Sequence, residues 1–161
     1  MFQVKYKIIL KLILIFSIFA ILTAYFIQYV LGHEPCNLCL IERIPYILSI
    51  IIISIYLFTQ KFEKITLIIL SLIFFVAALV SFYHFGIEQG FIKESLVCNL
   101  NSSDIELSKE ALLNQLKKMP ANCKDVTFKI FGLSLATFNI FISLILSAIT
   151  TKLFLTYEKN K

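Results

Sequence analysis

Four cysteines are the residues of this chain whose type and spacing could do chemistry. Cys36 and Cys39 form a C-x-x-C motif, whereas Cys98 and Cys123 lie 25 residues apart. A disulfide across C-x-x-C closes a very small ring, which is typical of a bond that is made and broken. In a small chain, four cysteines indicate a disulfide framework, a metal site or redox chemistry.

Two metal-based interpretations are weaker than the redox one. Zinc also binds C-x-x-C, and Cys98 with Cys123 could complete a four-sulfur site, but the long separation of that second pair disfavours it. A c-type haem requires His directly after the second cysteine, where this chain has Leu40. We therefore expect no metal, and we interpret the cysteines as two redox pairs.

Composition places most of the chain in lipid. Hydrophobic residues make up 59% of the 161 residues and charged residues only 16%, outside the usual balance of soluble domains. Four segments are long and apolar enough to cross about 30 Å of hydrocarbon as helices, at residues 8–31, 40–59, 65–86 and 130–153. The net charge of +5 is scattered at the ends of these runs, which disfavours nucleic-acid binding.

The expected fold is an all-α membrane protein, a four-transmembrane-helix bundle that forms a single membrane domain over residues 1–161. Two loops, at 32–39 and 87–129, lie on one side of the membrane and carry the four cysteines. Lysines in the short segments beside the spans place both termini in the cytoplasm and the loops outside, although the long loop has lysines of its own. The first span is expected to be a retained anchor, because it is too long for a signal peptide.

The second loop is expected to carry a short amphipathic helix. Ser103 and Glu106 match a capping box, and Ser108 is an alternative N-cap. The apolar face of this helix would comprise Leu112, Leu116 and Met119. Such a helix could lie on the membrane surface or pack on the loop or the bundle.

Charged residues flank the C-x-x-C motif at the membrane boundary. Cys39 precedes the second span, where a helix N-terminus favours a thiolate, and Arg43 follows four residues later. A helix that begins near Leu38 would put guanidinium and sulfur on one face, whereas Pro45 indicates a start nearer Arg43. The Arg43 guanidinium could donate a hydrogen bond to a carbonyl oxygen of a bound electron acceptor. Alternatively, it could anchor the helix at the membrane interface by snorkelling to lipid headgroups.

His84 and Glu88 lie where the third span leaves the membrane. A histidine at an interface is more often a hydrogen-bonded amphipathic residue than a catalyst. His33 is a weaker candidate still.

The order and spacing of these residues resemble the disulfide bond formation protein B (DsbB) family, membrane oxidases that recharge a periplasmic thioredoxin-fold dithiol oxidase. The resemblance covers nearly the whole chain and rests on the four-span plan and on four sequence features. These are Cys36-Asn-Leu-Cys39-Leu-Ile-Glu-Arg43-Ile-Pro45, Tyr83-His-Phe-Gly-Ile-Glu88, the pair Cys98 and Cys123, and Gly132-Leu-Ser-Leu-Ala-Thr-Phe-Asn139. Phe138 is a departure, because many relatives carry Trp there.

The resemblance implies a protein-dithiol:quinone oxidoreductase of the bacterial inner membrane and a role for each cysteine. Cys98 and Cys123 would form the disulfide that accepts electrons from a DsbA-like partner, with Cys98 in the mixed disulfide. Cys36 and Cys39 would form the disulfide that reoxidises the first pair. The quinone, either ubiquinone or menaquinone, would face Cys39 and be positioned by Arg43, and we add His84 as a further candidate for its binding.

Two other classes of function remain as alternatives. The main one is a structural tetraspan protein whose two disulfides merely staple its outer loops, without redox turnover. A transport module would require polar residues inside the spans, which hold mainly Ser and Thr besides Gln28 and Asn139.

Overall fold

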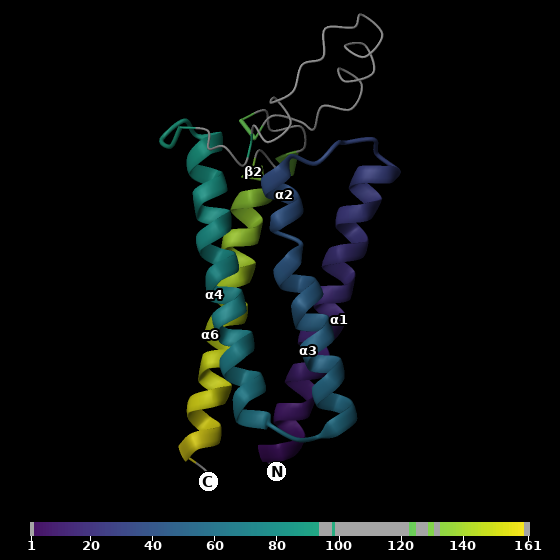
Figure 1. The fold of residues 1–161 in the computed structure, drawn as a ribbon, viewed down its shortest axis with the longest axis vertical. Helices are drawn as coiled ribbons and strands as arrows, with labels where there is room; N and C mark the ends of the chain where they lie inside the picture. The colour runs from purple at the N-terminus through teal and green to yellow at the C-terminus, as the bar shows by residue number, and fades with distance from the viewer. Residues whose placement is uncertain (1, 94–97, 99–122, 125–128, 131–132, 160–161) are drawn as a thin grey trace, which may run out of the picture.

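The computed structural model describes residues 2–93, 98, 123–124, 129–130 and 133–159. Its long helices are α1 (Phe2–Tyr29), α3 (Ile44–Thr59), α4 (Glu63–Glu88) and α6 (Leu135–Lys159) (Figure 1). A short helix, α2 (Asn37–Ile41), leads into α3. Two short strands, β1 (Lys129–Ile130) and β2 (Leu133–Ser134), pair antiparallel just before α6, with Lys129 opposite Ser134.

Four helical segments among the described residues are long and apolar enough to cross a membrane: Tyr6–Tyr29, Asn37–Thr59, Glu63–Glu88 and Leu135–Lys159. The prediction of an all-α, four-span membrane protein is therefore confirmed. The second segment reaches its length by joining α2 to α3. The amphipathic helix predicted within residues 103–119 lies outside the described residues.

The sequence predicted that the last span begins at residue 130, but the helix begins at Leu135. The preceding residues form the β1–β2 hairpin instead. Ser134 ends this hairpin, and its Oγ accepts a hydrogen bond from the backbone N–H of Thr137 at 3.3 Å. A serine in that position satisfies one of the donors that a helix start leaves unpaired. The hairpin and the serine together fix where α6 begins.

Each long helix packs on its neighbour in the order α1, α3, α4 and α6. The core between them is apolar and includes Leu10, Ile53, Leu70 and Phe74, each fully buried. Since lipid is as apolar as these side chains, their association depends on close packing and on interhelical hydrogen bonds. Two such bonds join Ser49 to Ser17 at 2.9 Å and Ser71 to Thr151 at 2.6 Å.

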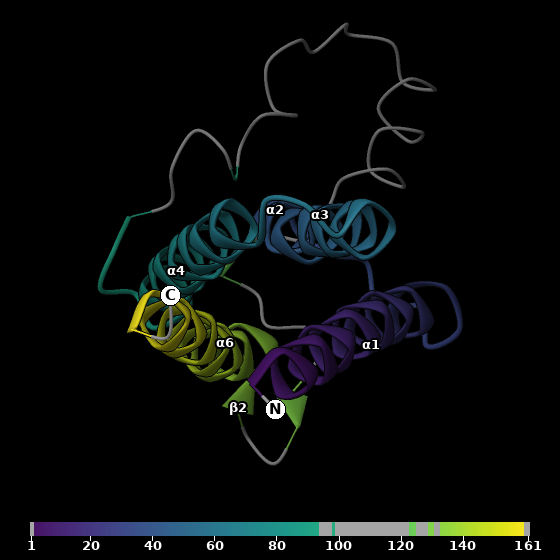
Figure 2. The same ribbon diagram turned by 90° about the horizontal axis from the view of Figure 1, so that it is seen from below.

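The two ends of the bundle differ. Both chain termini lie at one end, together with the tight connection from α3 to α4 (Figure 1). At the opposite end α1 leans away from α6, and α2 lies at the end of α3 (Figures 1 and 2). The bundle is therefore more open at the end that carries the cysteines.

Candidate functional site

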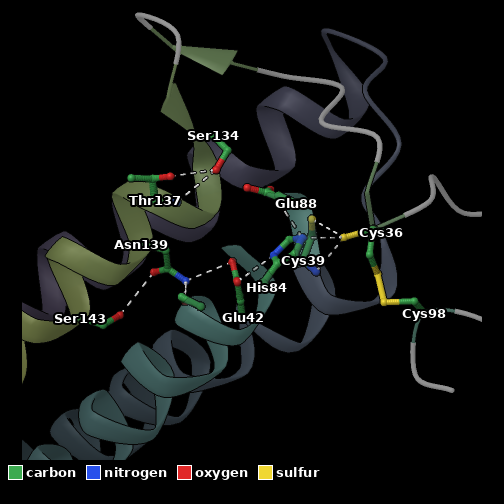
Figure 3. Close-up of polar contacts among 12 residues, drawn as sticks. Cys36, Cys39, Glu42, His84, Glu88, Cys98, Ser134, Thr137, Asn139 and Ser143 are labelled. Atoms are coloured by element: carbon green, nitrogen blue, oxygen red, sulfur yellow. Dashed lines mark hydrogen bonds and ion pairs between the residues drawn. A yellow bond between two sulfur atoms is a disulfide. The ribbon is translucent and has the colours of Figure 1, made fainter. Parts of the chain in front are cut away.

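All four cysteines gather at this open end. Cys36 and Cys123 belong to one buried cluster with Leu38 and Ile87, and Cys39 and Cys98 pack against it. Cys98 is joined to Cys123 by a disulfide bond, the pair that the family resemblance implies. Cys36 and Cys39 are thiols, with 2.7 Å between their Sγ atoms, and so do not form here the disulfide that the resemblance implies for them (Figure 3). The site thus holds one dithiol and one disulfide side by side.

The dithiol is positioned by a break between two helices. Cys36 is the N-cap of α2, Glu42 is its C-cap, and Arg43 is the N-cap of α3. Pro45 occupies the first turn of α3, where a residue without an N–H is tolerated. Both helix starts considered from the sequence therefore occur, one in α2 and one in α3. Cys39 lies within α2 and Arg43 follows in the break, so they do not belong to one continuous helix.

The groups that stabilise a thiolate surround Cys36 in this structure, and the expectation from sequence had favoured Cys39. The backbone N–H of Cys39 donates to Cys36 Sγ at 3.2 Å, and His84 Nε2 lies 3.5 Å from the same sulfur. The Cys39 thiol, followed by His84, lowers the pKa of Cys36 despite its burial. The reason for the difference is that α2 starts directly after Cys36, so its first-turn donor faces that residue.

His84 connects the dithiol to a buried carboxylate. The ring is 3% exposed, and its Nδ1 lies 2.9 Å from Oε1 of Glu42. Its Nε2 faces Cys36 Sγ and also lies 3.7 Å from Oε1 of Glu88. The Glu88 side chain is 6% exposed, and its Oε2 has no hydrogen-bond partner in the described structure. His84 therefore acts as a bridge between sulfur and two acidic groups.

Asn139 holds the other oxygen of Glu42. Its Nδ2 donates to Glu42 Oε2 at 3.2 Å and to Ser81 Oγ at 2.7 Å (Figure 3). Its Oδ1 accepts hydrogen bonds from Tyr46 and, at 3.4 Å, from Ser143. One amide on α6 thus binds α3, α4 and the break after α2. Because every polar group at membrane depth must be satisfied inside the protein, this amide fixes the carboxylate and, through it, the histidine ring.

Arg43 is held on the α1 side of the site. Its Nη1 donates to Oε1 of Gln28 at 2.7 Å, and its guanidinium carbon lies 5.2 Å from the centre of the Tyr25 ring. This arrangement fixes the chain's single arginine by a hydrogen bond and a cation–π contact.

A cavity of about 330 Å³ adjoins the dithiol. Cys36, Cys39, Arg43 and His84 line it together with Glu42, Glu88 and Cys123, and α1 and α6 supply most of its apolar walls. Those apolar walls include Phe16, Phe19, Ile27, Phe138 and Ile142. Its size and its few convergent polar groups are typical of small-molecule sites. His33 also lines the cavity.

Sequence reasoning identified most of these side chains but missed Glu42 and the role of Asn139. Glu42 carries a formal charge within the second span and follows Cys39 by three residues. An ionisable residue at that depth is a functional candidate by default, so the signal was present. Asn139 stood out only as a polar residue in an apolar run. Its link to Glu42, 97 residues away, appears only in the folded bundle.

The fold and the site define a multi-pass membrane protein with a buried dithiol placed beside a disulfide. The family model for disulfide bond formation protein DsbB matches residues 6–153, so the chain belongs to the DsbB family and the resemblance is confirmed. Membership makes it an oxidoreductase of disulfide formation. A relative from Rickettsia prowazekii (strain Madrid E), named "Uncharacterized protein RP370", is 30% identical over 161 residues, covering 97% of this chain and 91% of the relative.

Replacing Asn139 by Ala should lower the free energy of unfolding by about 2–3 kcal/mol, because Glu42, Ser81 and Tyr46 would each lose a buried partner. Ser143→Ala is the matched control, since it removes the long 3.4 Å hydrogen bond to the same amide and leaves the bonds of Asn139 to Glu42 and Ser81 in place. Its effect should stay below about 1 kcal/mol. Denaturant titration in detergent micelles measures both. Equal effects of the two variants would contradict the central role of Asn139.

Proposed function

We propose that this protein reoxidises a DsbA-like, thioredoxin-fold dithiol oxidase and passes the electrons to a membrane quinone. One observation carries the proposal: the Cys36/Cys39 dithiol packs in one cluster with the Cys98–Cys123 disulfide and also lines a largely apolar cavity. A relay between a water-soluble protein and a lipid-soluble acceptor needs both contacts.

The sulfur chemistry balances in two exchanges. A thiolate of the partner attacks Cys98, the Cys98–Cys123 bond breaks, and a mixed disulfide forms. The partner's second thiolate then releases Cys98, which leaves the partner oxidised and the Cys98/Cys123 pair reduced. In the form with a Cys36–Cys39 disulfide, Cys123 then attacks Cys36 and Cys39 leaves as a thiolate. Cys98 next attacks Cys123, which restores the Cys98–Cys123 bond and leaves Cys36 and Cys39 reduced. The attack on Cys36 is supported by the packing of Cys36 and Cys123 in one buried cluster.

The lining of the cavity fits a quinone ring. Its apolar walls on α1 and α6 suit the ring and the start of an isoprenoid tail, while Arg43 offers N–H donors for a carbonyl oxygen. Cys39 and His84 line the same cavity. When bound, a quinone supplies the acceptor for two electrons and two protons of the dithiol. The residues contribute binding by Arg43 and a proton acceptor at His84, which Glu42 orients.

The membrane orientation belongs to the same proposal. We place the end with both termini in the cytoplasm, since Lys5, Lys7, Lys61 and Lys64 lie near it in short segments. The cysteines then face the periplasm of a bacterial inner membrane, where thiols are kept oxidised and the partner resides.

A purely structural role for the cysteines is the competing proposal. It leaves the buried His84 and Glu42 beside Cys36 without a purpose, although burying such a pair is unfavourable unless something is gained. It also leaves the adjoining cavity unexplained.

Cys39→Ser should abolish quinone-dependent oxidation of a reduced DsbA-like protein by the purified chain, because no disulfide can form at the cavity. Leu40→Ser is the matched control, since its parent side chain is the neighbouring residue of α2 and is exposed. The assay follows quinone reduction by absorbance. Undiminished turnover of Cys39→Ser would exclude the mechanism.

Cys123→Ala should trap the partner on Cys98, because the free Cys98 thiolate attacks the disulfide of an oxidised partner and no Cys123 thiolate remains to displace the partner from Cys98. The complex is expected in cells as a band sensitive to reductant, and mass spectrometry identifies the attached protein. The double variant Cys98→Ala, Cys123→Ala is the control and should give no such band. A trapped protein without a thioredoxin-like C-x-x-C would overturn the choice of partner.

A further inference from the structure

The reduced dithiol lies in a group of side chains that could also bind a metal ion. Cys36 Sγ, Cys39 Sγ and His84 Nε2 all lie within 4.8 Å of one another. A candidate fourth ligand is Glu88, whose Oε1 lies 3.7 Å from His84 Nε2 but not within 4.8 Å of all three of these atoms. The Glu88 side chain is only 6% exposed, and its Oε2 has no hydrogen-bond partner in the described structure.

We propose that the reduced form of this protein binds one thiophilic divalent cation of the zinc type through Cys36, Cys39, His84 and Glu88. Two thiolates, one imidazole and one carboxylate oxygen form a ligand set that suits zinc. The proposal concerns an ion that competes with catalysis and is not a resident cofactor. It does not depend on the quinone or on the partner protein.

Two distances at His84 Nε2 are close to those of a tetrahedral site, whereas the Cys39 sulfur and the Glu88 carboxylate would have to move. Ordinary zinc–sulfur and zinc–nitrogen bond lengths give a sulfur-to-nitrogen separation of about 3.6 Å and a nitrogen-to-oxygen separation of about 3.4 Å. The observed values are 3.5 Å from Cys36 Sγ to His84 Nε2 and 3.7 Å from that nitrogen to Glu88 Oε1. The two sulfurs are 2.7 Å apart and would have to separate by about 1 Å. Cys39 is less deeply buried than Cys36, so we assign this movement to the Cys39 side chain.

The surroundings of the histidine match those of a metal ligand. Nδ1 of His84 lies 2.9 Å from Glu42 Oε1, so that Nε2 is left to face the two sulfurs and Glu88. Histidines that bind metals usually donate their other ring N–H to a carboxylate, which fixes the tautomer and the ring orientation. Asn139 in turn holds the second oxygen of Glu42. The carboxylate–histidine pair is thus built before any ion binds.

Redox state decides whether the ion can bind. Each cysteine loses its proton on binding, and the two negative charges are neutralised by the divalent cation. A Cys36–Cys39 disulfide has no thiolate to offer, so the oxidised form should not bind. Cys98 and Cys123 are bonded to each other and therefore cannot complete the four-sulfur zinc site that the sequence left open. An ion held by both thiolates would block their oxidation.

Cobalt is the probe for this site, because thiolate ligation of Co²⁺ gives a sulfur-to-metal charge-transfer band and tetrahedral ligation gives intense visible bands. The full chain carrying Cys98→Ala and Cys123→Ala is reduced, freed of reductant and titrated with Co²⁺ without quinone. One equivalent should produce both bands, and Zn²⁺ should displace it. The oxidised chain should produce neither.

Substitutions in this background separate the four-ligand site from simple chelation by two thiols. His84→Gln, Glu88→Gln and Glu42→Gln should each weaken Co²⁺ binding by about tenfold or more. His33→Gln is the matched control and should leave the affinity unchanged, because His33 lies near the cavity but outside the ligand group. Absence of the bands, or unchanged affinity in both His84→Gln and Glu88→Gln, would overturn the proposal.

A second measurement needs no substitution at the ligands. In the same Cys98→Ala, Cys123→Ala chain, Zn²⁺ should slow alkylation of Cys39 by at least tenfold, and a chelator should restore the rate. Alkylation at the same rate with and without Zn²⁺ would likewise overturn the site. Neither assay uses quinone turnover. A failure of the metal-site proposal can therefore be distinguished from a failure of the proposed function.

Discussion

The contact between Cys36 and His84 is the interaction on which the arrangement of this site depends. It brings a sulfur of the first loop against α4, and it is possible only because Glu42 occupies the other side of the imidazole ring. A carboxylate and an imidazole buried at the end of a membrane bundle are unfavourable unless each polar atom has a partner. Asn139 supplies that partner from α6. Three helices and the break after α2 are thereby tied to the position of one sulfur.

This chain of contacts also explains the division of the bundle into a closed end and an open end. Toward the termini, the helices meet through apolar side chains such as Leu10, Leu67 and Leu153. Near the cysteines, α1 diverges from α6, and the polar groups of the site take the place of that packing (Figure 1). At this end of the bundle, the residues that hold the dithiol stand where apolar side chains would otherwise pack. The cavity lies next to the dithiol for that reason.

Much of this could be predicted from sequence, because hydrophobic length determines spans and the C-x-x-C motif marks a redox pair. The four-span fold, the cysteine positions and the family were all accessible in that way. The position of Cys39 relative to Arg43 was harder to predict from sequence. Pro45 is compatible with two helix starts, and the chain uses both, one for α2 and one for α3. The preference for Cys36 as thiolate depends on where α2 begins. The bond from Asn139 to Glu42 depends on the packing of α6, which local pattern does not specify.

The central claim is that the two cysteine pairs can exchange electrons directly, through Cys36 and Cys123 of one buried cluster. The most direct measurement uses a chain with Cys39→Ser and Cys98→Ala, in which only these two thiols remain, and maps disulfides by peptide mass spectrometry after mild oxidation. The account predicts an intramolecular Cys36–Cys123 disulfide in most molecules, formed faster than a Cys39–Cys123 disulfide in the Cys36→Ser, Cys98→Ala chain. If only disulfides between molecules formed, the two pairs could not communicate and the account would be contradicted.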